Sequence, residues 1–230
     1  MLALLVGLLL LPVAPPDTSW EYEALRRQMV QEQIEARGVE DPAVLEAMRS
    51  VPRHRFAPEH PPRLTYTDRP LPIGHGQTIS QPYIVARMTE IVRPAPTDRA
   101  LEIGTGSGYQ AAVLAEVVDS VYTVEIIPAL ADTARERLRR LGYDNVVVRT
   151  ADGFKGWPER APFDVIVVTA APERIPPPLK RQLAEGGRMI IPVGPSGRTQ
   201  RLTLVTKTDG TISTRELTPV RFVPFLRNKN

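Results

Sequence analysis

Short apolar runs alternate with segments of helical periodicity through the second half of the chain. Apolar strands are predicted at residues 100–103, 121–124, 146–148, 165–168 and 189–191. Helices are predicted between them at residues 109–117, 128–141 and 179–183, and glycines follow the last two, at Gly142 and at Gly186-Gly187. Repeated strand–helix–strand units place successive strands in parallel, so this alternation predicts an α/β fold with a doubly wound, mostly parallel sheet.

A helical segment and a long irregular stretch precede this core. Residues 21–37 carry apolar side chains at helical spacing and end at Gly38. Asp41-Pro42 supplies an N-cap and a first-turn proline for a second helix. Residues 51–82 are rich in proline, glycine, histidine and arginine, which predicts a long loop. Long loops inside compact domains usually carry function.

Both ends of the chain depart from the alternating pattern. Apolar residues at 202–206 and 212–217 flank Asp209-Gly210, which predicts a C-terminal β-hairpin. At the other end, residues 2–16 form an uncharged apolar run that is shorter than the ~20 residues of a membrane span. This run has the character of a signal peptide without its basic start, and a mistakenly extended sequence with translation beginning near Met29 fits equally well.

Composition narrows the possible function classes. Of 230 residues, 42% are hydrophobic and 24% are charged, which is the balance of an ordinary globular domain. A net charge of +3 without a dense Lys/Arg run argues against a nucleic-acid partner. The chain has no cysteine, which excludes disulfides, thiolate metal sites and cysteine nucleophiles. Its three histidines lack metal-ligand spacing, so we expect no metal.

The candidate cofactor site is a glycine-rich turn. The predicted strand at 100–103 runs directly into Gly104, Thr105, Gly106 and Gly108, and a predicted helix follows. Glycines permit a tight turn and let a ligand approach the backbone closely. On its own the same pattern also fits a strand-to-helix turn without a ligand.

Acidic residues identify the cofactor class. Glu125 ends the next predicted strand, where its carboxylate can accept hydrogen bonds from ribose hydroxyls. Glu102 lies just before the turn, where its charge would oppose a pyrophosphate but suit the sulfonium and amino groups of S-adenosylmethionine. Asp152-Gly153 follows the third strand, where Asp152 can accept from the adenine amino group or serve as a turn aspartate.

Two segments near the glycine turn are distinctive: residues 72–82 read PIGHGQTISQP and residues 101–109 read LEIGTGSGY. In these segments the sequence resembles the protein-L-isoaspartate (D-aspartate) O-methyltransferases, and the first segment is the more specific to that family. The likeness continues in order through YTVE at 122–125, DG at 152–153, GWP at 156–158, APFD at 161–164, QL and GG within 182–187, IPVG at 191–194 and RFVP at 221–224. It covers roughly residues 29–225, nearly the whole chain.

The resemblance implies a fold, an activity and a set of site residues. The expected fold is a Rossmann-like S-adenosylmethionine-dependent methyltransferase with N-terminal helices and a C-terminal β-hairpin. The expected activity is methylation of the free α-carboxyl of L-isoaspartyl residues, and of D-aspartyl residues where the enzyme accepts them, which starts repair through a succinimide. Ser80 is the expected active-site serine. Glu102, Gly104, Thr105, Gly106, Gly108, Glu125, Asp152, Gly153 and Ile79 are the expected cofactor residues.

The substrate residues and the overall organisation complete the prediction. Gln77, Thr78 and Val223 are the expected substrate-binding residues, although Val223-Pro224 fits a packed strand end equally well as a peptide-pairing tail. We expect one domain at residues 20–230, with an active-site region at 20–98, a cofactor core at 99–194 and C-terminal strands at 195–230, and the apolar segment 1–19 outside it. Damaged proteins are the expected partners, and the protein is expected to be a monomer in the cytoplasm, or exported if residues 2–16 direct it.

Three other functions use the same scaffold. A nucleic-acid amino-methyltransferase would carry an Asn/Asp-Pro-Pro-aromatic turn where this chain has Thr169-Ala170-Ala171-Pro172. A small-molecule carboxyl or O-methyltransferase differs only at residues 76–82, and a silent cofactor-binding protein would not need Ser80.

Overall fold

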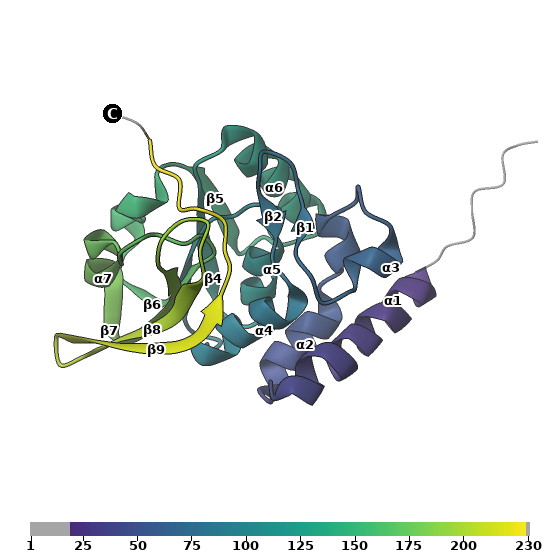
Figure 1. Cartoon of the computed structure of the whole chain (residues 1–230), viewed down its shortest axis with the longest axis horizontal. Coiled ribbons are helices and arrows are strands. Elements are labelled where there is room, and N and C mark those ends of the chain that lie inside the picture. Colours follow the sequence, from purple (N-terminus) through teal and green to yellow (C-terminus); the bar gives the residue numbers. More distant parts are fainter. Residues whose placement is uncertain (1–18, 229–230) are drawn as a thin grey trace, which may run out of the picture.

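A computed structural model describes residues 19–228 and arranges them around a seven-stranded sheet (Figure 1). The strands lie in the order β5-β4-β3-β6-β7-β8-β9. Their bounds are β3 Arg99–Ile103, β4 Ser120–Glu125, β5 Val146–Thr150, β6 Phe163–Val168, β7 Leu183–Val193, β8 Gln200–Thr208 and β9 Thr211–Val220. Strands β3 to β7 pair in parallel, and β8 and β9 add an antiparallel edge. The predicted doubly wound, mostly parallel sheet is confirmed.

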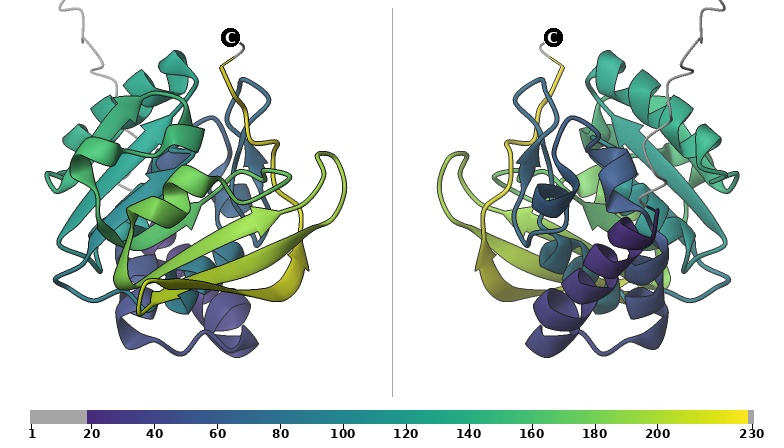
Figure 2. Two further views of the ribbon diagram at one scale, coloured as in Figure 1. Left: turned by 90° about the vertical axis from the view of Figure 1, so that its left-hand side faces the viewer. Right: turned by 90° about the vertical axis from the view of Figure 1, so that its right-hand side faces the viewer.

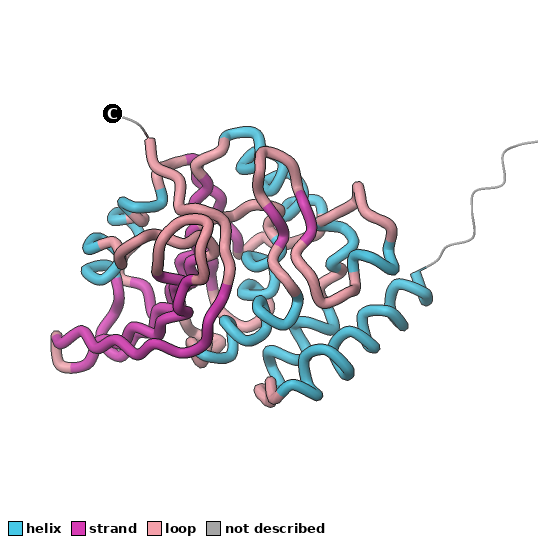
Figure 3. Tube along the Cα trace, in the orientation of Figure 1, coloured by secondary structure: helices cyan, strands magenta, loops and turns pink. Residues whose placement is uncertain are grey.

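Helices pack on both faces of the sheet (Figure 2). One face carries α4 Pro82–Ile91, α5 Tyr109–Ala115 and α6 Pro128–Arg140. Helix α2 Pro42–Ser50 packs on α4 and α5, and α1 Ser19–Gln28 packs outside it against α2. The other face carries α7 Pro177–Gln182. A short helix, α3 Pro62–Thr65, and a two-stranded hairpin of β1 Leu71–Pro72 and β2 Thr78–Ile79 interrupt the long loop that appears in pink in Figure 3.

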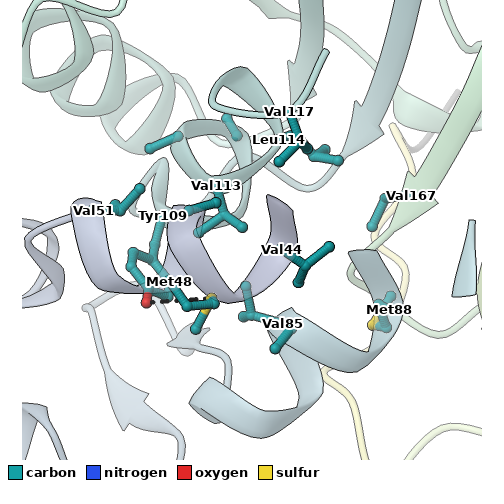
Figure 4. Close-up of a cluster of buried hydrophobic side chains, with 14 of the residues drawn as sticks. Val44, Met48, Val51, Val85, Met88, Tyr109, Val113, Leu114, Val117 and Val167 are labelled. Atoms are coloured by element: carbon teal, nitrogen blue, oxygen red, sulfur yellow. Dashed lines mark hydrogen bonds between the residues drawn. The ribbon is translucent and has the colours of Figure 1, made fainter. Parts of the chain in front are cut away.

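Alternate side chains of the central strands supply two cores. In β6, Val165 and Val167 face α4 and α5, while Ile166 and Val168 face α7. A strand buried on both sides needs apolar residues at every position, which explains the unbroken run at 165–168. In Figure 4, Tyr109 lies among the side chains of α2, α4 and α5, and its hydroxyl donates to Met48 Sδ at 3.9 Å.

The N-terminal helix has a wide final section that the sequence pattern did not predict. The segment predicted as one helix at 21–37 is helical throughout, but α1 ends at Gln28 and a π-helical turn spans Met29–Ile34. Met29, Val30 and Ile34 are each fully buried, and Met29 and Ile34 are five residues apart, the interval of a π turn. Val30 and Ile34 keep the four-residue interval of an α-helix, so the pattern of buried residues did not reveal the wider turn. Gly38 then ends the segment at φ 84°, as predicted.

The glycine pair after α7 lies inside a strand. The sequence pattern predicted that Gly186-Gly187 stops a helix before a strand at 189–191, but β7 already begins at Leu183. Phe163 pairs with Leu183, whereas Val165 pairs with Arg188, so the two glycines belong to a bulge. A Cβ on Gly187 would lie 3.0 Å from the Asp164 carbonyl oxygen, which leaves room only for glycine in this bulge.

Helix α4 and the C-terminal hairpin compare differently with the prediction. Helix α4 was not predicted, although Pro82 begins it and Val85 and Met88 form its buried side, a pattern that could have revealed it. The predicted hairpin is confirmed, with Asp209 and Gly210 at positive φ between β8 and β9.

The apolar segment 2–16 lies outside the described residues. Within residues 19–228, no helix combines the length and the hydropathy that crossing a membrane requires.

Candidate active site

The glycine turn follows β3 at the point where strand order reverses. From β3 the chain first builds β4 and β5 on one side and then returns to β6 on the other, and ligands bind in such crevices at the carboxyl ends of the strands. Gly104 has φ 101°, and a Cβ there would lie 2.3 Å from Thr169 Oγ1. Thr169 follows β6, and its hydroxyl donates to the Gly104 carbonyl at 2.7 Å. Close contact between these two loops therefore requires glycine at position 104.

Glu125 fixes the conformation of this turn. Its Oε2 accepts from the Gly106 amide at 2.8 Å, and its Oε1 accepts from the Ile127 amide at 3.0 Å. A carboxylate oxygen can accept more than one hydrogen bond, so both oxygens retain capacity for ribose hydroxyls. Glu125 is 5% exposed and lines a cavity beside Gly106, and its predicted cofactor role stays a prediction.

Glu102 is fully buried behind the turn. Thr123 Oγ1 donates to its Oε2 at 2.5 Å, and Thr105 Oγ1 lies 2.6 Å from Thr123 Oγ1, so Thr105 is the donor in that second contact. Burial, reinforced by the nearby Glu125 charge, raises the pKa of the Glu102 carboxyl to about 8, although the Thr123 hydrogen bond acts in the opposite direction. Within residues 19–228, Glu102 Oε1 has no hydrogen-bond partner. A carboxyl with this pKa carries a proton at neutral pH, and a cation bound beside it would favour the ionised form. The role toward a cationic ligand stays a prediction.

Asp152 makes one contact that is typical of a turn aspartate and one that the sequence pattern did not predict. Its Oδ1 accepts from the Phe154 amide at 3.0 Å, and its Oδ2 accepts from Arg227 Nε at 2.9 Å. The adjacent Gly153 packs against Ile103. Asp152 is thus a turn aspartate, the second of the two predicted alternatives, and its role toward the adenine amino group stays a prediction.

The loop that carries Ser80 is held by its own turn and by Asp68. Gly74, His75 and Gly76 all have positive φ and form the exposed tip of the β1–β2 hairpin. Asp68 accepts from the Tyr83 amide at 2.9 Å and from Gln81 Nε2 at 2.6 Å. These contacts fix the chain on the C-terminal side of Ser80. No sequence motif identified Asp68 in advance.

Ser80 lies between two cavities. It borders a groove of about 810 Å³ that is formed by α4, the end of β9 and the following tail. It also borders a small cavity of about 30 Å³ beside Glu102 and the glycine turn. Ser80 is half-buried, and its hydroxyl makes no hydrogen bond to any other residue between 19 and 228.

The structure brings together most, but not all, of the predicted site residues. The small cavity beside Ser80 gathers Thr78, Ile79, Glu102, Gly104, Thr105 and Gly106. A neighbouring cavity gathers Gln77, Thr78, Gly104, Gly106, Glu125, Gly153 and Val223. Gly108 instead packs against Leu138 of α6, and Asp152 lies beside the second cavity rather than in its wall. The structure adds three residues to the site that the sequence did not predict: Thr169, Phe225 and Arg227. Of these, only Thr169 could have been found from the sequence, because it directly follows a predicted apolar strand.

This strand order, with a glycine turn after the first core strand and an acidic residue ending the second, defines the chain as an S-adenosylmethionine-dependent methyltransferase. The chain belongs to the protein-L-isoaspartate(D-aspartate) O-methyltransferase family, whose model matches residues 24–230. The family and the cofactor expected from the sequence motifs are confirmed, and with them S-adenosylmethionine-dependent methylation in protein repair.

Relatives support this assignment over nearly their full length. A protein-L-isoaspartate O-methyltransferase from Gloeobacter violaceus is 61% identical, covering 87% of this chain and 98% of the relative. One from Opitutus terrae is 59% identical, covering 89% of this chain and 88% of the relative.

Solved structures agree with the fold. A protein-L-isoaspartate O-methyltransferase structure matches with TM-score 0.79 and 32% identity, covering 86% of this chain and 65% of that longer chain. A Plasmodium falciparum protein described as an enzyme of the same family, in complex with S-adenosyl-L-homocysteine, matches with TM-score 0.75 and 28% identity, covering 88% of this chain and 99% of the other.

Proposed function

We propose that this chain transfers a methyl group to the free α-carboxylate of L-isoaspartyl residues in damaged proteins, with Ser80 orienting the carboxylate. The observation that carries the proposal is the position of Ser80, between a groove large enough for a peptide segment and the glycine turn. The groove lies against α4 and the C-terminal tail, so a damaged loop can enter from the surface.

The residues present fit S-adenosylmethionine. Glu102 Oε1 makes no hydrogen bond within residues 19–228, and a cationic group bound beside it would favour the ionised carboxylate. The remaining acceptor capacity of Glu125 suits ribose hydroxyls. When bound, S-adenosylmethionine supplies an electrophilic methyl group. Ile79 and the glycine turn would form apolar and backbone walls around it.

The chemistry needs orientation more than proton transfer. A carboxylate with an ordinary pKa near 3.9 is already ionised at neutral pH, so its oxygen can attack without a general base. No Lys or His lines the small cavity beside Ser80. A neutral hydroxyl can donate to the carboxylate and aim it without cancelling its charge, whereas a lysine would stabilise the ground state more strongly.

The three expected substrate-binding residues, Gln77, Thr78 and Val223, do not all lie at the groove. Thr78 and Val223 both line it, whereas Gln77 lines only the neighbouring cavity. The Val223 carbonyl accepts from the Ala171 amide at 2.9 Å, and Pro224 has no N–H. We therefore propose that Val223 contacts a peptide through its side chain rather than by backbone pairing.

Incubation with labelled S-adenosylmethionine and matched peptides tests the function. We expect base-labile label in a peptide that contains L-isoaspartate and none in the same peptide with normal L-aspartate. A D-aspartyl peptide reports whether the second activity is present. Equal labelling of the L-aspartyl peptide, or labelling only of small carboxylic acids, would refute the proposed substrate.

Glu125→Ala is expected to weaken S-adenosylhomocysteine binding about tenfold, because it removes both the ribose acceptor and the Gly106 hydrogen bond. Isothermal titration calorimetry measures the change. Glu159→Ala is the matched control, since Glu159 pairs with Arg149 on the surface and should leave the dissociation constant unchanged. An unaltered constant in Glu125→Ala would contradict the assignment.

Location, assembly and organisation stay proposals. We propose a single domain over residues 20–230 that acts as a monomer in the cytoplasm. The groove beside Ser80 is formed within one chain, which supports a monomeric unit, and the cytoplasm is where S-adenosylmethionine is made.

A further inference from the structure

The C-terminal tail crosses the carboxyl ends of the central strands (Figures 1 and 2). Pro224 forms a parallel bridge with Ala171, and the Phe225 amide donates to the Ala171 carbonyl at 3.1 Å. Residues 223–226 then form one wall of the cavity whose other walls include Gly106, Glu125 and Gly153. The tail therefore covers the site that the proposed function gives to the cofactor.

Arg227 ties the end of this tail to Asp152. Arg227 Nε donates to Asp152 Oδ2 at 2.9 Å, and the guanidinium lies 3.7 Å from the centre of the Phe154 ring. Asp152 is 5% exposed at its side chain, whereas Arg227 is 46% exposed. Asp152 is thus a buried anion whose only cationic partner within the described residues arrives from the surface.

The cavity beneath the tail is small. Its volume is about 50 Å³. Ligand pockets usually enclose roughly 300–1,000 Å³. The bridge to Ala171 and the Arg227–Asp152 pair are the principal hydrogen bonds of residues 223–227, and Phe225 packs against the apolar cluster beside Gly153. Admission of a nucleoside-sized ligand requires this segment to shift, and the Arg227–Asp152 pair is one of the contacts that such a shift would break.

We propose that Arg227 is a latch that competes with the adenine amino group for Asp152 and thereby limits the affinity and exchange rate of the cofactor. The inference rests on the proposed function, because it takes Asp152 as the adenine acceptor. Asp152 Oδ1 is held by the Phe154 amide, so Oδ2 is the oxygen that both partners need. Oδ2 can accept a second hydrogen bond, but the guanidinium already offsets its charge. The adenine amino group would therefore gain a weaker hydrogen bond while Arg227 is bound than after Arg227 has left.

Three properties of the pair set the expected size of the effect. The hydrogen bond is charge-assisted and one partner is buried, which makes it stronger than a surface pair. The other partner is nearly half exposed, which weakens it through solvent screening. Removal of the guanidinium is therefore expected to tighten binding about 5–10-fold, and salt is expected to mimic part of that gain.

Arg227→Ala tests the latch, with Arg149→Ala as its control. Arg149 pairs with Glu159 and lies over the Trp157 ring, so it makes a similar ion pair and ring contact on neighbouring surface. Calorimetry should show about 5–10-fold tighter binding of S-adenosylhomocysteine to Arg227→Ala and no change in Arg149→Ala. Stopped-flow measurements should show that S-adenosylhomocysteine associates faster with Arg227→Ala than with the unmodified chain. Between 50 and 500 mM NaCl, the affinity of the unmodified chain for this ligand should rise, whereas that of Arg227→Ala should not.

A nucleoside pair identifies the atom that competes. Adenosine should gain affinity in Arg227→Ala, whereas purine riboside, which lacks the amino group, should not. Equal or weaker binding of S-adenosylhomocysteine by Arg227→Ala, in a variant with unchanged thermal unfolding, would overturn the latch and leave the proposed function intact. Failure of the unmodified chain to bind S-adenosylhomocysteine would overturn both.

Discussion

Ser80→Ala is expected to lower kcat for an isoaspartyl peptide about 100-fold while leaving the dissociation constant of S-adenosylhomocysteine within about twofold. The hydroxyl of Ser80 is free to donate at the junction of the groove and the small cavity. Its loss removes the group that aims the carboxylate, and misorientation of a reacting oxygen is costly because proximity and alignment supply much of the rate. Labelled methyl transfer measures kcat, and calorimetry measures binding.

Ser107→Ala is the matched control for that variant. Ser107 borders the same small cavity but not the groove, so its hydroxyl cannot reach a carboxylate that enters from the groove. We expect this variant to keep kcat within a few-fold of the unmodified chain. Undiminished transfer by Ser80→Ala would remove Ser80 from the mechanism.

Glu102→Gln is expected to stabilise the folded chain relative to the unmodified chain, and more so at alkaline pH. The gain in unfolding free energy should be on the order of 3–5 kcal/mol larger at pH 8.5 than at pH 5. Burial raises the pKa of Glu102 to about 8, against 4.5 in the unfolded chain. The folded state therefore holds a proton that the unfolded state releases. The contribution is fully present below pH 4.5 and is lost as pH rises to about 8, where the folded chain must accommodate a buried anion.

Urea unfolding at pH 5, 7 and 8.5 measures this difference. The free energy of unfolding of Glu102→Gln minus that of the unmodified chain should rise steadily between pH 5 and pH 8.5, because the amide that replaces the carboxyl cannot ionise. Other titrating groups cancel in the subtraction. Parallel pH profiles for the two proteins would show that Glu102 is ionised in the folded state at neutral pH.

Local sequence signals predicted the sheet and the centre of the site. A strand buried on both faces needs apolar residues at every position, as at 165–168, so the run of residues itself predicts it. The turn at Gly104 needs a positive φ, which the glycine itself indicates. The family motifs then connected Ser80 with Glu125, which lie far apart in sequence, and both line cavities at the glycine turn.

Contacts between segments that are distant in sequence could not be predicted from the sequence pattern. Asp68 holds the Ser80 loop through the Tyr83 amide, and a backbone donor leaves no trace in side-chain spacing. The Arg227–Asp152 pair joins residues 75 apart in sequence, and each side chain alone is typical of a solvated surface. Gly186-Gly187 was misassigned because a bulge and a helix stop require the same residue type.

The wide helical turn at Met29 depends on the helix that precedes it. Met29 is fully inaccessible to solvent, and the preceding helix stacks Tyr22 on His54 with ring centres 4.0 Å apart. Proteolytic removal of residues before Met29 would abolish that stacking and would place a terminal ammonium, with an ordinary pKa near 8, in an apolar interior. Such a product would have to expose its first turn to solvate the new charge, which would loosen the helical layer beneath the Ser80 loop.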